Sequence, residues 1–323
     1  MIATVAPPPR HSTSGAILAQ ARVAFRLHRF VLLAVAGMVL VASAAALVVA
    51  AALRDAAPTI CAGSWQSCQG YTSRFDQIDS WAGPLMGILG GVAPIGGLFA
   101  GVGLVAREIE DRTAPLAWSL SPSRTRWLFG RVAPVAAVLL VLFAIAAIAA
   151  TELERARYPG IDPLLSFYGE SSRGLELVAI GFLVFAGAVL SGSIVGRVMP
   201  SLILAAVLGL ALTVGAFAAE AAWIPSQAVI VDAETGASYK GAFYIDQLVR
   251  LQTGELIPTQ DVVFEEDANG NLTGRLAGSK IEAHLVPGER HPFVEAVDSA
   301  GMLAAAGALL VLTGFVVRRR RPY

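Results

Sequence analysis

Uncharged stretches of about 20 residues recur along the chain, and all of the charge lies in the segments between them. A helix needs roughly 20 apolar residues to cross about 30 Å of hydrocarbon, and only a helix satisfies its own backbone hydrogen bonds over such a length. The longest stretches contain no Asp, Glu, Lys, Arg or His. The pattern therefore predicts six transmembrane helices, at residues 30–53, 84–105, 132–151, 177–196, 198–219 and 299–317.

Arginine residues concentrate before the first stretch, between the second and third, and after the last. Because basic residues in short flanking segments stay on the cytoplasmic side, both chain ends are expected in the cytoplasm of a multi-pass cell-membrane protein. The expected organisation is a cytoplasmic leader at 1–29, five spans within 30–219 with a cytoplasmic loop at 106–127, an extracytoplasmic segment at 220–297, and a last span with a basic tail at 298–323.

Composition agrees with a membrane protein. Hydrophobic residues make up 55% of the chain, charged residues 15%, and the mean hydropathy is +0.64. That exceeds what a soluble domain of this length needs to fill one core. We therefore expect an all-α polytopic membrane protein.

Two further segments have a recognisable character. In the leader, helical spacing places Ile17, Leu18, Ala21, Ala24 and Phe25 on one face, with arginines along its edge, which predicts an amphipathic helix in the membrane interface. The alternative is a disordered basic leader.

In the segment 220–297, the runs QAVIV, DVVFEE, ANGN and LTGRL predict a small extracytoplasmic α/β or β-containing insertion, with the last three runs forming a hairpin.

The chain has two cysteines, Cys61 and Cys68, in the first loop expected outside the cell. Because that compartment permits oxidation, we expect a disulfide bond between them, the alternative being two unpaired thiols.

Motifs for bond chemistry are missing from the sequence. It contains no G-x-x-x-x-G-K-[ST] loop, G-x-S-x-G turn, H-E-x-x-H helix or Cys/His cluster. We expect no enzyme, no catalytic residue, no metal site, no nucleic-acid partner and no cofactor on this chain. The apolar spans also disfavour proton-coupled transport, which needs ionisable groups inside the membrane, but leave sodium coupling open.

The cytoplasmic loop at 106–127 gathers charges and two tryptophans into one short segment. Thr113 can cap a short helix with Pro115 in its first turn, and Ser121 before Pro122 can cap the third span. An apolar side with a charged rim is typical of a partner interface. The alternative is an interfacial loop whose tryptophans lie at headgroup level. The candidate partner-binding residues are Glu108, Thr113, Leu116, Trp118, Leu120, Arg124 and Trp127.

The run VAREIEDRTAPLAWSLSPSRTRWLFGR, residues 105–131, resembles the cytoplasmic loop of ABC-2-type transporter permeases, especially those of actinobacteria. In that family an arginine and a glutamate lead into Thr-x-x-Leu-Ala-Trp and then Ser-x-x-Arg-x-x-Trp-Leu. The segment HLVPGERHPFVEAVDSAGMLAAAGALLVLTGFVVRRRR also looks like the family's ending. Two features depart from the family: Arg112 stands where a glycine is usual, and the aromatic-rich approach to the last helix is reduced to His291, Pro292 and Phe293.

The resemblance implies the membrane subunit of an ABC exporter, with residues 113–120 as the coupling helix. Two permease chains, forming a homo- or heterodimer, would work with two ATPase chains that carry ATP and Mg²⁺. The second and fifth spans would line the path of an amphipathic or lipophilic substrate. Two alternatives stay open: a sensor or assembly protein whose segment 220–297 binds a ligand, and a sodium-coupled carrier.

Overall fold

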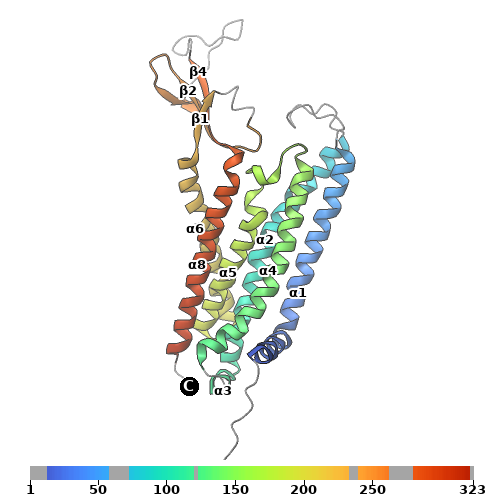
Figure 1. Ribbon diagram of the computed structural model, residues 1–323, viewed down its shortest axis with the longest axis vertical. Helices are drawn as coiled ribbons and strands as arrows, with labels where there is room; N and C mark the ends of the chain where they lie inside the picture. The colour runs from blue at the N-terminus through green and yellow to red at the C-terminus, as the bar shows by residue number, and fades with distance from the viewer. Residues whose placement is uncertain (1–12, 58–72, 120–122, 233–238, 262–278, 321–323) are drawn as a thin grey trace, which may run out of the picture.

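Six long helices run side by side in the computed structural model, which describes residues 13–57, 73–119, 123–232, 239–261 and 279–320, with the side chains of 13–24 left aside (Figure 1). Each helix contains one of the expected apolar stretches and is long and apolar enough to cross a membrane, so the prediction of six spans is confirmed. The helices are α1 (Thr13–Ala56), α2 (Ser73–Glu110), α4 (Arg124–Arg157), α5 (Gly174–Val195), α6 (Val198–Trp223) and α8 (His291–Arg319).

A small antiparallel sheet lies between α6 and α8 in the sequence and at one end of the bundle in space (Figure 1). This confirms the expected β-containing insertion before the last helix. The hairpin expected from DVVFEE, ANGN and LTGRL lies almost entirely outside the described residues. The strands, in the spatial order β1-β4-β2-β3, are β1 (Val229–Asp232), β2 (Phe243–Arg250), β3 (Leu256–Pro258) and β4 (Lys280–Val286).

The two ends of the bundle differ. The first turns of α1 and the end of α8 lie at the same end as the short helix α3 (Ala114–Ser119), opposite the sheet (Figure 1). We call these the α3 end and the sheet end. The described part of the leader, residues 13–29, forms the first part of α1 and bends away from the long axis, and its placement in a membrane interface stays a prediction. Cys61 and Cys68 lie outside the described residues, so their disulfide also stays a prediction.

Helix α5 is the centre of the bundle, with nearly every residue from Glu176 to Ser193 buried. It packs against α2 at a backbone-to-backbone distance that only glycine permits. A Cβ added at Gly101 of α2 would lie 2.7 Å from the Phe185 carbonyl oxygen, and one at Gly192 of α5 would lie 2.8 Å from the Val102 carbonyl oxygen. Small residues let helices approach this closely in a bilayer, where apolar side chains gain nothing by leaving lipid.

Helix α6 is the most exposed of the long helices. Its buried positions in the apolar part are Ser201, Ala205 and Gly209, which follow one another at four-residue spacing and form a narrow stripe. Gly209 lies against Val184 of α5. Leu212 and Ala216 are half-buried against α5 and α8, and most of the other side chains of α6 are apolar and exposed in the single chain.

At the sheet end, Arg173 joins the segment before α5 to the start of α8. Its side chain is buried and donates to the Tyr168 carbonyl at 2.9 Å and to Nε2 of His291 at 3.5 Å. Because a guanidinium only donates, Nε2 accepts and Nδ1 of His291 donates to the Leu164 carbonyl at 3.0 Å. Burial, followed by the nearby Glu220 carboxylate, raises the pKa of Glu170 to about 8, so this end keeps a protonated carboxyl at neutral pH.

The α2–α5 contact gives a first prediction. Gly101→Ala should lower the thermal stability of the purified chain, because the new methyl group meets the Phe185 carbonyl and forces the helices apart, at a cost of about 1–3 kcal/mol. Gly87→Ala on the same helix is the matched control, since an added Cβ there has no neighbour within 4 Å. The midpoint of thermal unfolding in detergent is the measurement. Equal midpoints for the two variants would contradict the tight contact.

Candidate functional site

The short helix α3 lies at the surface between α2 and α4, and a tight turn leads into it. The amide of Thr113 donates to the Glu108 carbonyl at 3.0 Å and that of Arg112 to the Ile109 carbonyl at 3.2 Å, which is a Schellman end of α2. Arg112 has φ 57°, the only positive φ of a non-glycine residue in the described part of the chain. A glycine would adopt such a backbone more readily than Arg112 does, so the turn keeps its form here with an unfavourable residue.

The capping residues differ in detail from the expectation. Thr113 directly precedes α3, as predicted, but its hydroxyl donates to the Glu108 carbonyl at 3.2 Å and so closes the turn behind it. Ser123 caps α4 by accepting a hydrogen bond from the Arg126 amide at 3.2 Å. The expectation that Ser121 is this cap is wrong, because the helix begins three residues later, at Arg124.

A buried ion pair lies beneath α3. Glu108 near the end of α2 contacts Arg131 near the start of α4, with side-chain exposures of 11% and 16%. The guanidinium of Arg131 also lies over the ring of Trp127, 5.7 Å from its centroid. We expected Glu108 to be a rim charge facing a partner. Its side chain is buried instead, because α2 and α4 bring it against Arg131.

The tryptophans brace α3 against α4. The rings of Trp118 and Trp127 meet edge to face, with centroids 5.9 Å apart, and the Arg124 guanidinium lies 4.6 Å from the centroid of Trp118. Trp127 is only 6% exposed and belongs to the main core, whereas Trp118 is half-buried against it. Leu116 points outward and is 65% exposed. Leu120 lies outside the described residues. Of the apolar residues expected to bind a partner that the structure describes, Leu116 is the one presented at the surface.

Charged side chains at the α3 end also cap neighbouring helices. Arg124 donates to the carbonyl of Arg318 at the end of α8 at 3.2 Å. Glu110 accepts from the amide of Val198 at the start of α6 at 2.8 Å. Arg320 donates to carbonyl groups at the end of α5. Residues on either side of α3 therefore contact α6 and α8, and the end of α8 in turn contacts α5.

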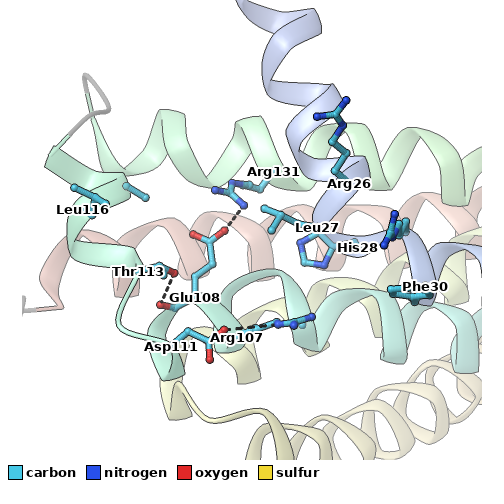
Figure 2. Close-up of a pocket in the computed structure, with 13 residues that line it drawn as sticks. Arg26, Leu27, His28, Phe30, Arg107, Glu108, Asp111, Thr113, Leu116 and Arg131 are labelled. Atoms are coloured by element: carbon cyan, nitrogen blue, oxygen red, sulfur yellow. Dashed lines mark hydrogen bonds and ion pairs between the residues drawn. The ribbon is translucent and has the colours of Figure 1, made fainter.

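A cavity of about 550 Å³ opens beside α3 and reaches α1. Figure 2 shows Glu108 and Arg131 pointing toward each other across it, with Arg107 beside Asp111 on α2. The residues that line it are Arg26, Leu27, His28, Arg29, Phe30, Gly103, Arg107, Glu108, Asp111, Thr113, Leu116, Ala117 and Arg131.

The sequence model of one protein family, described as ABC-2 membrane transporter related, matches residues 28–220. The chain belongs to this family. Comparison with curated proteins and with solved structures gave no match. The matched region runs from α1 through α6 and includes α3, the ion pair and both tryptophans, which supports the predicted ABC-2-type permease. The sheet and α8 lie beyond it, so the likeness of the last helix to the family's ending stays a prediction.

Sequence reasoning did not predict the contacts of three residues at this site: Glu110, Arg131 and Arg320. The two arginines counted only toward orientation, and Glu110 only toward the charge of the loop. A signal was present, since Glu108 and Arg131 are opposite charges at the ends of adjacent apolar stretches, and so at similar depth. The helix rotation that brings them together cannot be read from either stretch alone.

The buried pair gives a second prediction. Glu108→Gln should lower the stability of the chain by about 3–5 kcal/mol, because it leaves the Arg131 charge buried without a carboxylate. Asp111→Asn is the matched control: its pair with Arg107, at 3.7 Å, is exposed and should contribute about 1 kcal/mol or less. Thermal unfolding in detergent measures both.

Adding Arg131→Met to Glu108→Gln should recover most of the lost stability, since it removes the unpaired charge. Similar losses of stability in Glu108→Gln and Asp111→Asn would mean that the buried pair contributes no more to stability than the exposed one.

Proposed function

We propose that the chain is the membrane-spanning subunit of an ATP-driven ABC exporter, and that α3 is the coupling helix that docks on a separate ATPase chain. The observation that carries this proposal is the form of α3: a short surface helix that presents Leu116 outward and is braced from behind by Trp118 on Trp127. Partner interfaces favour such an apolar anchor within a polar rim.

The packing behind α3 supports a mechanism. When two ATPase chains close on ATP and Mg²⁺, a push on α3 reaches α2 through the turn at Arg112 and reaches α4 through the tryptophan pair. The ion pair between Glu108 and Arg131 makes α2 and α4 move together. The caps on α5, α6 and α8 carry the displacement across the bundle. In a unit of two permease chains and two ATPase chains, this motion opens an outward path between the permeases.

Orientation is part of the proposal. The α3 end carries the arginine-rich leader and the basic end of α8, which the positive-inside rule assigns to the cytoplasm. A cytosolic ATPase can reach α3 only there. The sheet then lies outside the cell membrane.

The proposed cargo is amphipathic or lipophilic. Helices α2 and α6 meet where Val102 packs on Ala205, and the uncovered faces of α6 carry large apolar side chains such as Leu210 and Phe217. Such a wall between two permease chains would suit a molecule with little charge. A transport assay in vesicles with a panel of small molecules tests this, and movement of hydrophilic solutes alone would overturn it. No feature of the described residues favours the sensor or sodium-carrier alternatives over this reading.

The docking surface gives a third prediction. Leu116→Glu should weaken binding of the ATPase about thirtyfold, since loss of a central anchor is worth on the order of 2 kcal/mol. The tagged chain, purified from its own cells, should lose an ATPase that carries a P-loop motif and should no longer stimulate ATP hydrolysis. Thermal stability should be unchanged, because Leu116 is exposed.

Leu164→Glu is the matched control, an exposed leucine at the sheet end, and should keep the ATPase. Trp118→Ala is less informative, since it also removes the packing on Trp127. If Leu116→Glu retains both copurification and stimulation, α3 is an interfacial loop and not a coupling helix. Because the ATPase is cytosolic, a loss confined to Leu116→Glu also fixes the orientation.

A further inference from the structure

The cavity beside α3 has a basic wall and an apolar wall. Arg26 and Arg29 come from α1, Arg107 from α2 and Arg131 from α4, so three helices contribute guanidinium groups. Leu27 and Phe30 line it as well, and Phe30 is the first residue of the apolar stretch of α1. We propose that this cavity binds the phosphate headgroup of an anionic phospholipid, with the acyl chains passing along Phe30 into the membrane.

Not every guanidinium group of the cavity is neutralised by a carboxylate. Arg131 is paired with Glu108, and Arg107 weakly with Asp111. Within the described residues, Arg26 and Arg29 form no ion pair, and the Arg29 guanidinium lies 4.7 Å from the centroid of the Phe30 ring. Guanidinium groups match phosphate oxygens with two parallel hydrogen bonds, and basic pockets between transmembrane helices bind anionic lipid headgroups.

A buried histidine is a second, independent sign of a ligand. The side chain of His28 is part of the cavity wall and only 8% exposed, yet Nε2 has no hydrogen-bond partner in the described structure. Buried polar atoms are nearly always paired, so an unpaired nitrogen in a side chain that belongs to the cavity wall points to a partner that the cavity could supply. A phosphate or glycerol oxygen could serve as that partner.

The apolar wall selects a lipid over a soluble phosphate. Phe30 is 72% exposed, and a Cβ added at Gly103 has no neighbour within 4 Å, so the cavity continues along α1 and α2 toward the hydrocarbon. A phosphate ion would fill only the basic part. A phospholipid covers both walls, and its headgroup lies at the depth where the arginines occur.

Binding at this site would also support α3. Thr113, Leu116 and Ala117 line the cavity, so a bound headgroup would lie against α3. The binding itself does not depend on the proposed transport function, and its test uses the chain without an ATPase.

The test is native mass spectrometry of the full chain in detergent with added dioleoyl phosphatidylglycerol. Arg26→Gln combined with Arg29→Gln should lower the affinity for this lipid at least about tenfold. Gly103→Leu should lower it similarly by filling the cavity, with every charge kept. The matched controls are Arg126→Gln combined with Arg319→Gln, exposed arginines at the same end, and Gly87→Leu on α2; both should bind as the original chain does.

Four outcomes would overturn the proposal. Equal loss in the two arginine variants would indicate diffuse electrostatic attraction. Unchanged binding in Gly103→Leu would place the lipid elsewhere. Equal binding of dioleoyl phosphatidylcholine would remove the role of headgroup charge. If inorganic phosphate displaces the lipid at equal concentration, the cavity holds a soluble anion. Thermal unfolding of each variant separates loss of the site from loss of the fold.

Discussion

The close contact between α2 and α5 determines the rest of the bundle. Gly101 and Gly192 remove the side chains that would hold the two backbones apart, and α5 is then enclosed by α2, α4, α6 and α8. In a membrane this contact cannot depend on the hydrophobic effect, since lipid tails are as apolar as leucine, so it depends on how closely the surfaces fit. The position of α2 against α5 also fixes where α3 lies in the bundle, since α3 follows the Schellman turn that ends α2.

Charged residues are confined to the two ends of the bundle, where they form hydrogen bonds and ion pairs between helices that are held in their apolar parts by packing. At the α3 end, Glu108 and Arg131 hold α2 to α4, while Arg124 and Arg320 cap α8 and α5. At the sheet end, Arg173 ties the start of α5 to α8 through His291. A buried charge is tolerated only with a partner, so each of these contacts restricts how the helices can move. A force on α3 would therefore displace the helices that are joined to it, and not only the loop that contains it.

The two proposals meet at α3. Leu116 is exposed toward the proposed ATPase and also lines the cavity that contains Arg26 and Arg29 of α1. Among the described residues, the polar caps at the α3 end do not include α1, which packs on α2 and α4, and the cavity is a place where a ligand would contact both α1 and α3. A lipid that bridges α1 and α3 would supply the missing connection, and the membrane composition would then affect how firmly α3 is supported.

Local sequence determined much of this protein. The length of the apolar stretches predicted six spans, the alternating runs predicted a β-containing insertion, and a capping residue predicted a short helix after Thr113. Each of these features depends on positions close together in the sequence. The tertiary structure alone decided that Glu108 pairs with Arg131 and is not exposed, that Trp127 belongs to the core, and that Leu116 is left at the surface. Those facts depend on the rotation and depth of helices that pack against one another, and no single stretch of sequence contains that information.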